Sequence, residues 1–118
     1  MPITLTPLRY PGGKTAYSGL LLDVIRLNGL KNVTLVEPYA GGAGASIKLL
    51  LEGRVKHIVL NDLDPSIYAF WWSVVNCPNE LISLIHSCDI SINSWRRQKM
   101  VFLSGDTSDL LKLGFALF

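Results

Sequence analysis

Two short apolar runs separated by a glycine-rich turn constrain the possible folds of this chain more than any other feature. The runs cover residues 33–36 and 57–60, and each has the length and β-branched content of a buried strand. Between them lie a turn over residues 37–44 and a predicted helix over 45–52, which Gly53 ends. Strands that alternate with helices are typical of a parallel sheet, whose strands are covered on both faces. We therefore expect an α/β fold of parallel strands with flanking helices.

The rest of the chain is predicted to be helical after a first segment, residues 1–14, whose prolines and glycines indicate a loop. Pro65 and Pro78 suit the first turns of two of these helices. Two strands are too few for a sheet that is covered on both faces, so we expect excess apolar surface that packs on elements outside these residues. The predicted helices cover residues 15–27, 66–75, 78–87, 94–103 and 108–118.

Composition excludes several classes of protein. With 118 residues the chain forms at most one domain, and its 49% hydrophobic and 17% charged residues exclude a disordered chain. No apolar stretch approaches the roughly 18 residues that span a bilayer, and no secretory signal is visible. We therefore expect a cytoplasmic protein with no membrane partner. A net charge of +2 is too small to indicate nucleic-acid binding by itself.

Cysteine and histidine spacing gives no indication of a metal site. Cys77 and Cys88 are too few for a disulfide framework or a zinc site, and we expect two free thiols. His57 and His86 have no second ligand at a spacing that suits a metal. No metal is therefore expected.

The turn over residues 37–44 predicts a cofactor site. Its glycines let the backbone turn tightly and approach a ligand, and the helix that follows offers unpaired N–H groups. Asp62 follows the second strand, where a carboxylate can accept two hydrogen bonds from a ribose diol. Together these features predict a cofactor that contains adenosine. A dinucleotide site would need a third small residue where Ile47 stands, which disfavours NAD.

The sequence Gly13-Lys14-Thr15 matches only the end of a phosphate-binding loop. That motif requires a glycine at the position of Leu8, so ATP binding through this loop is not expected. A lysine beside glycines can still hold a carboxylate through its point charge.

A basic and aromatic cluster surrounds Trp95, and such clusters can contact a phosphate backbone. We expect instead that Trp95, Met100 and Leu103 form the packed apolar side of a helix, while the basic residues face water. Trp71 and Trp72 are likewise expected in the core.

Three segments together resemble one family. Residues 9–14 (RYPGGK) resemble the N-terminal cofactor motif of the Dam-like N6-adenine DNA methyltransferases, and residues 37–44 (EPYAGGAG) resemble their S-adenosylmethionine loop. Residues 61–64 (NDLD) resemble the family's acidic motif, and the order of the segments is also the family's order. The resemblance implies a partial Rossmann-like S-adenosylmethionine-dependent methyltransferase fold. It also implies site-specific methylation of adenine N6 in double-stranded DNA, an activity found in restriction–modification systems.

The resemblance implies roles for individual residues. Tyr10 and Lys14 would contact the methionine half of the cofactor, with Lys14 suited to its carboxylate and the Tyr10 ring to its sulfonium or its apolar stem. Asp62 would bind the ribose hydroxyls, and a role for Asp64 is less well defined.

The same resemblance assigns the glycine-rich turn to the cofactor. Tyr39 and Gly41 match the first half of the family's loop motif, F-x-G-x-G. The second glycine of that motif falls on Ala43, which is a departure from the family pattern. Gly42 and Gly44 on either side keep the backbone permissive, so both join the predicted cofactor-binding residues.

The chain lacks the D-P-P-Y type motif with which this family holds the flipped adenine, so no catalytic residue is assigned. The family's target-recognition segment is not found either, and residues 114–118 are apolar. We therefore expect residues 1–118 to be the N-terminal cofactor-binding part of a longer enzyme, inactive alone and associating with its C-terminal part. The alternatives are a non-catalytic cofactor-binding remnant or subunit, and an NAD-dependent oxidoreductase.

Overall fold

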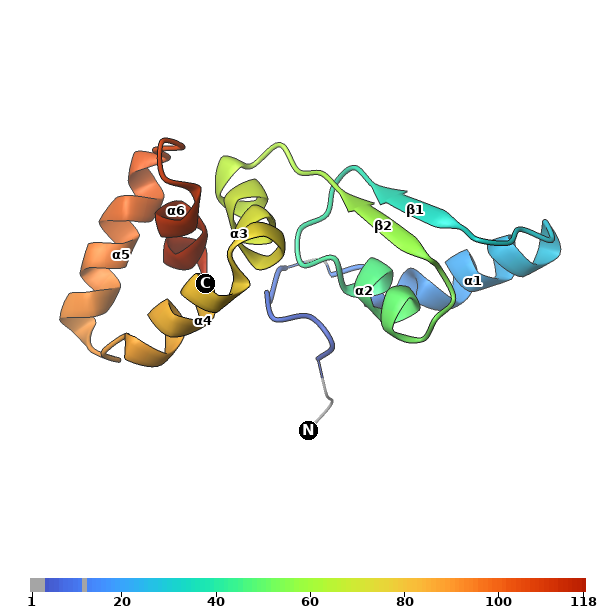
Figure 1. Cartoon of the computed structure of the whole chain (residues 1–118), viewed down its shortest axis with the longest axis horizontal. Helices are drawn as coiled ribbons and strands as arrows, with labels where there is room; N and C mark the ends of the chain where they lie inside the picture. The colour runs from blue at the N-terminus through green and yellow to red at the C-terminus, as the bar shows by residue number, and fades with distance from the viewer. Residues whose placement is uncertain (1–3, 12) are drawn as a thin grey trace. The chain divides into compact units, whose positions relative to one another are not determined.

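A computed structural model describes residues 4–11 and 13–118 of the chain. These residues form two compact units, of which the first ends at Asn61 and the second begins at Asp62. The first unit holds both strands, and the second is built from helices (Figure 1).

The first unit contains a parallel pair of strands joined by a helix. Strand β1 (Thr34–Glu37) pairs with β2 (His57–Leu60), with Thr34 opposite His57 and Glu37 opposite Leu60. Helix α2 (Gly44–Leu51) forms the crossover between the strands and packs against β2. This confirms the predicted parallel α/β arrangement, which is compatible with part of a methyltransferase fold. The strands and the crossover helix begin within one residue of their predicted positions.

A short 3-10 helix, η1 (Thr15–Tyr17), leads into helix α1 (Ser18–Leu27). Helix α1 ends where the Asn28 side chain donates to the carbonyl of Val24 and Gly29 adopts a φ of 60°, a value that favours glycine. Helices α1 and α2 pack on each other, and Figure 1 shows both of them below the strands.

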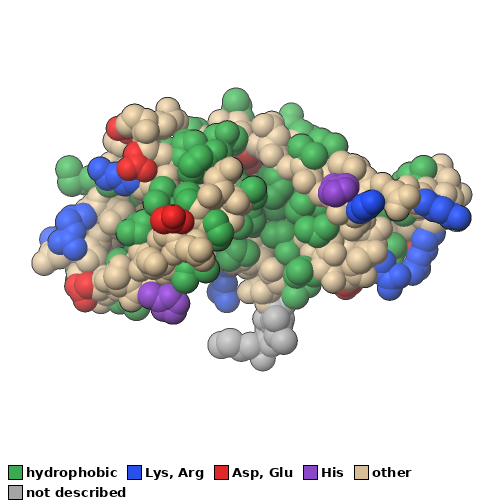
Figure 2. Space-filling model, in the orientation of Figure 1, with side chains coloured by type: hydrophobic (Ala, Val, Ile, Leu, Met, Phe, Trp, Pro, Cys, Tyr) green, Lys and Arg blue, Asp and Glu red, His purple; other side chains and the backbone are tan. Residues whose placement is uncertain are grey.

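Within the first unit the strands are covered on one face only, in agreement with the excess apolar surface expected of two strands, although each run was predicted to be a buried strand. Leu35 and Ile58 are half-buried on the face that the helices cover, whereas Val36 and Val59 remain 59% and 49% exposed on the other face. Hydrophobic side chains are accordingly visible at the surface over the strands (Figure 2). The physical reason is that α1 and α2 lie on the same side of the sheet, so no described helix of the first unit covers the other side.

The second unit consists of four helices: α3 (Pro65–Asn76), α4 (Pro78–Ser87), α5 (Ile92–Ser104) and α6 (Leu110–Leu117). Three of them begin at a capping side chain that accepts a hydrogen bond from a backbone N–H of the first turn. Asp64 caps α3, Ser91 caps α5 and Asp109 caps α6. Because Ser91 begins α5, this helix starts two residues before the predicted position.

The core of the second unit lies where α3 and α6 cross. Gly114 permits the close approach, since a Cβ atom there would lie 2.7 Å from the carbonyl oxygen of Ala69. The ring of Phe70 packs edge-on against Trp71, with centroids 5.1 Å apart, and is stacked on Phe118 at 6.0 Å. Trp71 is buried, as predicted, whereas Trp72 is half-buried.

The prediction that Trp95, Met100 and Leu103 form the packed side of α5 is wrong. Trp95, Met100 and Leu103 are 60%, 74% and 68% exposed. The inward side of α5 instead carries Ser94, which is buried, and Gln98, which is half-buried. Trp95 pairs with a basic residue of its own helix, because the ammonium of Lys99 lies 4.8 Å from the centre of its ring.

Within the residues described, no helix is long and apolar enough to cross a membrane.

Candidate functional site

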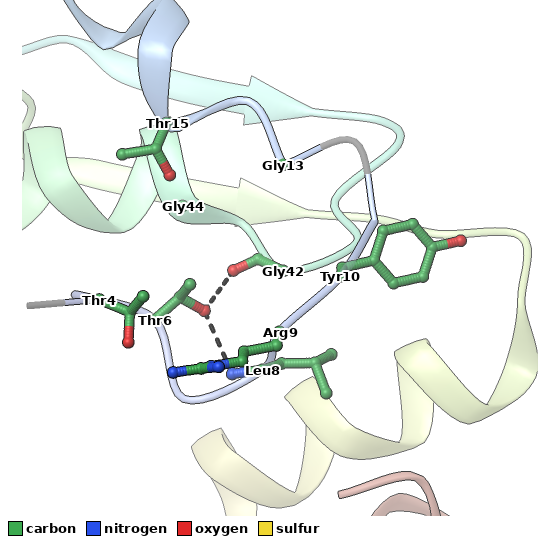
Figure 3. A pocket seen from close by; sticks show the side chains of 9 residues that line it. All are labelled: Thr4, Thr6, Leu8, Arg9, Tyr10, Gly13, Thr15, Gly42 and Gly44. Carbon is green, nitrogen blue, oxygen red and sulfur yellow. Dashed lines mark hydrogen bonds between the residues drawn. The ribbon is translucent and has the colours of Figure 1, made fainter. Parts of the chain in front are cut away.

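The candidate site forms where the N-terminal segment (residues 4–11, 13 and 14) lies across the glycine loop (residues 38–43), which joins β1 to α2. The hydroxyl of Thr6 donates a hydrogen bond to the carbonyl of Gly42 and accepts one from the N–H of Leu8 at 3.4 Å. Figure 3 shows this hydroxyl between the two backbone groups. The contact joins residues that are 36 positions apart in the sequence and fixes the segment against the loop.

Three glycines in and beside this contact have a close neighbour at the position of a Cβ atom. Gly41 has a φ of 48°, and a Cβ atom there would lie 2.9 Å from the ring of Tyr10. A Cβ atom at Gly42 would lie 2.5 Å from the carbonyl oxygen of Leu8, and one at Gly44 would lie 2.1 Å from the hydroxyl of Thr15. The absence of side chains on the loop therefore allows the N-terminal segment to approach its backbone directly.

Ala43 occupies the position at which the sequence departs from the glycine pattern. It adopts a left-handed conformation with a φ of 49°, and its side chain is buried. This conformation costs an alanine about 1–2 kcal/mol relative to right-handed backbone. A glycine would adopt this backbone conformation without that cost, so the left-handed turn is a local reason for glycine at this position.

Lys14 connects the N-terminal segment to the end of β1. Its ammonium donates to Oε1 of Glu37 at 3.0 Å and to the carbonyl of Tyr39. The other carboxylate oxygen of Glu37 accepts a hydrogen bond from the hydroxyl of Ser46 in the first turn of α2. One buried carboxylate therefore links three parts of the site: the N-terminal segment, β1 and α2.

The glycine loop is also fixed from the side of β2. The residue that follows this strand, Asn61, donates its N–H to the carbonyl of Glu37 at 3.0 Å. Its own carbonyl accepts the N–H of Ala40 at 2.9 Å. The turns at the carboxyl ends of both strands are thereby held in register.

Helix α2 begins at the end of the loop and is not capped by a side chain. The backbone N–H groups of a helix N-terminus favour anions and acceptor atoms, because the helix dipole adds partial positive charge there. This helix end and the ammonium of Lys14 give the site two groups that can attract a carboxylate.

Two hollows border this arrangement. A cavity of about 530 Å³ is lined by three of the predicted cofactor-binding residues, Tyr10, Gly42 and Gly44, together with Thr6 and Gly13 of the N-terminal segment. Its volume is within the range of small-molecule sites, roughly 300–1,000 Å³. A second, of about 320 Å³, is lined by residues that include Lys14, Glu37 and Tyr39.

Six of the seven predicted cofactor-binding residues lie in the first unit, and the structure brings them together there: Tyr10, Lys14, Tyr39, Gly41, Gly42 and Gly44. Their contacts are mutual. The ring of Tyr10 faces Gly41, and Tyr39, whose side chain is exposed, offers its carbonyl to Lys14. The roles of these residues toward a cofactor remain predictions.

The seventh predicted residue, Asp62, belongs to the second unit, in the turn that precedes α3. It is half-buried, and its Oδ1 accepts the N–H of Asp64 at 3.0 Å. Asp64 caps α3, and the hydrogen bond from the Ser66 hydroxyl, at 2.5 Å, lowers the pKa of this carboxyl. These contacts explain the motif locally: Asp62 shapes the turn and Asp64 starts the helix.

Sequence reasoning missed three residues of this site, namely Thr6, Glu37 and Ser46. Glu37 had a visible signal, since it is an acidic residue at the last position of an apolar strand, directly before a glycine loop. Thr6 lies two residues before Leu8, a spacing at which a hydroxyl accepts a backbone N–H, but its bond to Gly42 leaves no trace in the sequence.

No group of three histidine, cysteine or acidic side chains that could hold a metal ion occurs in the part of the chain that the structure describes.

Comparison with known proteins assigns the family. A sequence model of the family described as D12 class N6 adenine-specific DNA methyltransferase matches residues 10–103. The chain belongs to this family. The matched range of this methyltransferase includes the glycine loop and both strands and extends into α5. Searches of curated proteins and of solved structures each gave no match.

The match confirms the family that the three motifs indicated, and with it an enzyme family that methylates adenine in DNA. It does not favour the alternative of an NAD-dependent oxidoreductase.

Proposed function

We propose that this methyltransferase chain binds S-adenosylmethionine and forms the cofactor-binding part, over residues 1–118, of a Rossmann-like enzyme. The full enzyme would transfer a methyl group to the exocyclic amine of adenine in double-stranded DNA. The observation that carries the proposal is the contact of the N-terminal segment with the glycine loop. It joins two motifs that resemble the family's cofactor motifs, Tyr10 with Gly41 and Lys14 with Tyr39.

The residues present fit this cofactor. An ammonium has three N–H donors, and Lys14 uses two of them on Glu37 and Tyr39, so the third can bind the carboxylate of the methionine end. The glycine loop presents backbone that a Cβ atom would block at Gly41 and Gly42, which suits close approach by a ligand.

Each residue then has a defined task. The ring of Tyr10 offers an aromatic face to a cation, as the sulfonium requires, and the carboxylate of Asp62 can accept hydrogen bonds from ribose hydroxyls. When bound, the cofactor supplies the methyl group on a positively charged sulfur. These residues would bind and orient the cofactor. Holding reacting groups in the right geometry lowers the barrier of a transfer reaction.

A competition between two ligands tests the proposal. Thermal unfolding of the full chain is measured with S-adenosylhomocysteine and, separately, with NAD, over the same range of ligand concentrations. A ligand that binds only the folded state stabilises it by about 2.7 kcal/mol when its concentration is about 100 times its dissociation constant. We expect stabilisation by S-adenosylhomocysteine. Stabilisation by NAD alone would contradict the proposal.

A further inference from the structure

The carboxylate of Glu37 has a partner on each oxygen, although the resemblance assigns this residue no role. Its side chain is only 11% exposed, and each oxygen has its own donor. Oε1 accepts from the ammonium of Lys14 at 3.0 Å, and Oε2 accepts from the hydroxyl of Ser46. Ser46 is itself 1% exposed. A buried carboxylate with two fixed donors is a rigid acceptor, because a change in its orientation would leave buried polar groups unpaired.

A second ion pair in the first unit, between Lys48 and Glu52, differs from the pair of Lys14 and Glu37. Lys48 and Glu52 lie one turn apart near the end of α2, with 4.0 Å between charged atoms and side chains that are 36% and 42% exposed. Such a pair contributes little, about 0–1 kcal/mol. The pair of Lys14 and Glu37 joins positions that are 23 residues apart, and the carboxylate of this pair is shielded from solvent. Its geometry therefore constrains where the lysine ammonium lies.

We propose that Glu37 is a positioning residue for cofactor binding: it fixes the ammonium of Lys14 so that the remaining donor meets the carboxylate of the methionine end. This rests on the proposed function of the chain. A lysine side chain has four rotatable bonds, and its ordering on binding would otherwise weaken the interaction. Glu37 and the carbonyl of Tyr39 order it before the ligand arrives.

Ser46 extends the same device into helix α2. Because its hydroxyl holds Oε2 of Glu37, the carboxylate cannot rotate away from Lys14 without leaving the serine unpaired. Ser46 is also the third residue of α2, so the lysine ammonium and the uncapped helix end keep a fixed relation.

The test uses two ligands that differ only at the end in question. S-adenosylhomocysteine has the amino-acid carboxylate, and 5′-methylthioadenosine lacks the amino-acid part but keeps adenosine. Dissociation constants for both are measured by calorimetry with the full chain and its variants. We expect Glu37→Ala to weaken S-adenosylhomocysteine about tenfold, which corresponds to about 1.4 kcal/mol, and methylthioadenosine less than twofold. Glu37→Gln keeps an acceptor for Lys14, so its loss should be smaller.

A matched control is Glu52→Gln, which removes the same charge from the exposed pair on α2 and should change neither constant. A double variant shows whether Glu37 acts through the lysine. In a Lys14→Met background, Glu37→Ala should cause no further loss of S-adenosylhomocysteine affinity. Ser46→Ala should give a loss in the same direction as Glu37→Gln.

Several outcomes would overturn the inference. Equal losses for both ligands in Glu37→Ala would show a structural role only, and tighter binding of S-adenosylhomocysteine would show that Glu37 competes for Lys14. If Glu37→Ala does not fold, unchanged affinity in both Glu37→Gln and Ser46→Ala would refute the inference. Binding of neither ligand by the unsubstituted chain refutes the proposed function, and the inference with it.

Discussion

Replacing Gly42 with alanine tests the contact on which the candidate site depends. The φ of Gly42 is not in the left-handed region, so an alanine is not strained by its backbone, and only the new methyl group matters. Its Cβ atom would lie 2.5 Å from the Leu8 carbonyl oxygen, whereas ordinary contact begins at 3.4 Å, a shortfall of about 0.9 Å. The neighbour is backbone and cannot rotate away. The N-terminal segment must therefore move, which also strains the hydrogen bond from Thr6.

The expected loss follows from two opposed contributions. Overpacking of this kind costs about 1–3 kcal/mol. Alanine returns about 0.5–1 kcal/mol, because it restricts the unfolded chain more than glycine does. The midpoints of these two ranges differ by about 1.3 kcal/mol, so we expect Gly42→Ala to lower the free energy of unfolding by about 1 kcal/mol, measured by denaturant titration followed by circular dichroism. Trypsin should also cleave after Arg9 faster in the variant, since the segment is displaced.

Gly19→Ala is the matched control. No heavy atom lies within 4 Å of the Cβ position in this exposed glycine of α1, so the same substitution should stabilise by about 0.5–1 kcal/mol. If Gly42→Ala were as stable as the unsubstituted chain, with unchanged cleavage after Arg9, the close approach of segment and loop would be refuted.

Three further predictions concern the second unit and the activity. Asp62→Ala should weaken S-adenosylhomocysteine by about 1–2 kcal/mol, as expected for two lost hydrogen bonds, and an unchanged calorimetric affinity would remove its ribose role. The hydrogen bond from the Ser66 hydroxyl lowers the pKa of Asp64 in the folded state. This carboxyl therefore stabilises the fold at pH values above its unfolded pKa of about 3.9. The stabilisation is lost as the pH falls through the lower pKa of the folded state. Asp64→Asn keeps a capping side chain and should flatten that loss in melts between pH 2 and 6, whereas an identical pH profile would contradict the assignment. Finally, the purified 118-residue chain should incorporate no labelled methyl into unmethylated DNA, and incorporation by a contaminant-free sample would show that adenine is held without a D-P-P-Y type motif.

Local signals predicted the elements well, because their ends depend on residues close in sequence. Strand β2 and helix α4 have the predicted bounds, and Asp64 with Pro65 marks the start of α3. The start of α5 was missed by two residues, since Ser91 reaches the N–H of Ser94 and caps the helix earlier than its apolar pattern suggests.

Features that depend on distant residues were not predictable in the same way. The exposure of Val36 depends on which side of the sheet α1 occupies, and a short apolar run does not contain that information. The exposure of Trp95 also depends on tertiary packing. Helix α5 packs through the side that carries Ser94, so this serine is buried and the tryptophan is not. For the site, glycine and lysine positions were visible in the motifs, but the bond that Thr6 makes across 36 residues was not.

The crossing of α3 and α6 has a consequence for synthesis on the ribosome. The hydroxyl of Ser73 in α3 donates to the carbonyl of Leu110, which is 37 residues later in the chain. At roughly 5–20 residues per second, helix α3 leaves the ribosome about 2–7 s before its partner exists. During that interval the apolar side of α3, with Ile67 and Phe70, has nothing of its own unit to pack against but α4 and α5. The nascent chain therefore exposes the apolar side of α3 until α6 has been synthesised, and during this interval a chaperone could protect it.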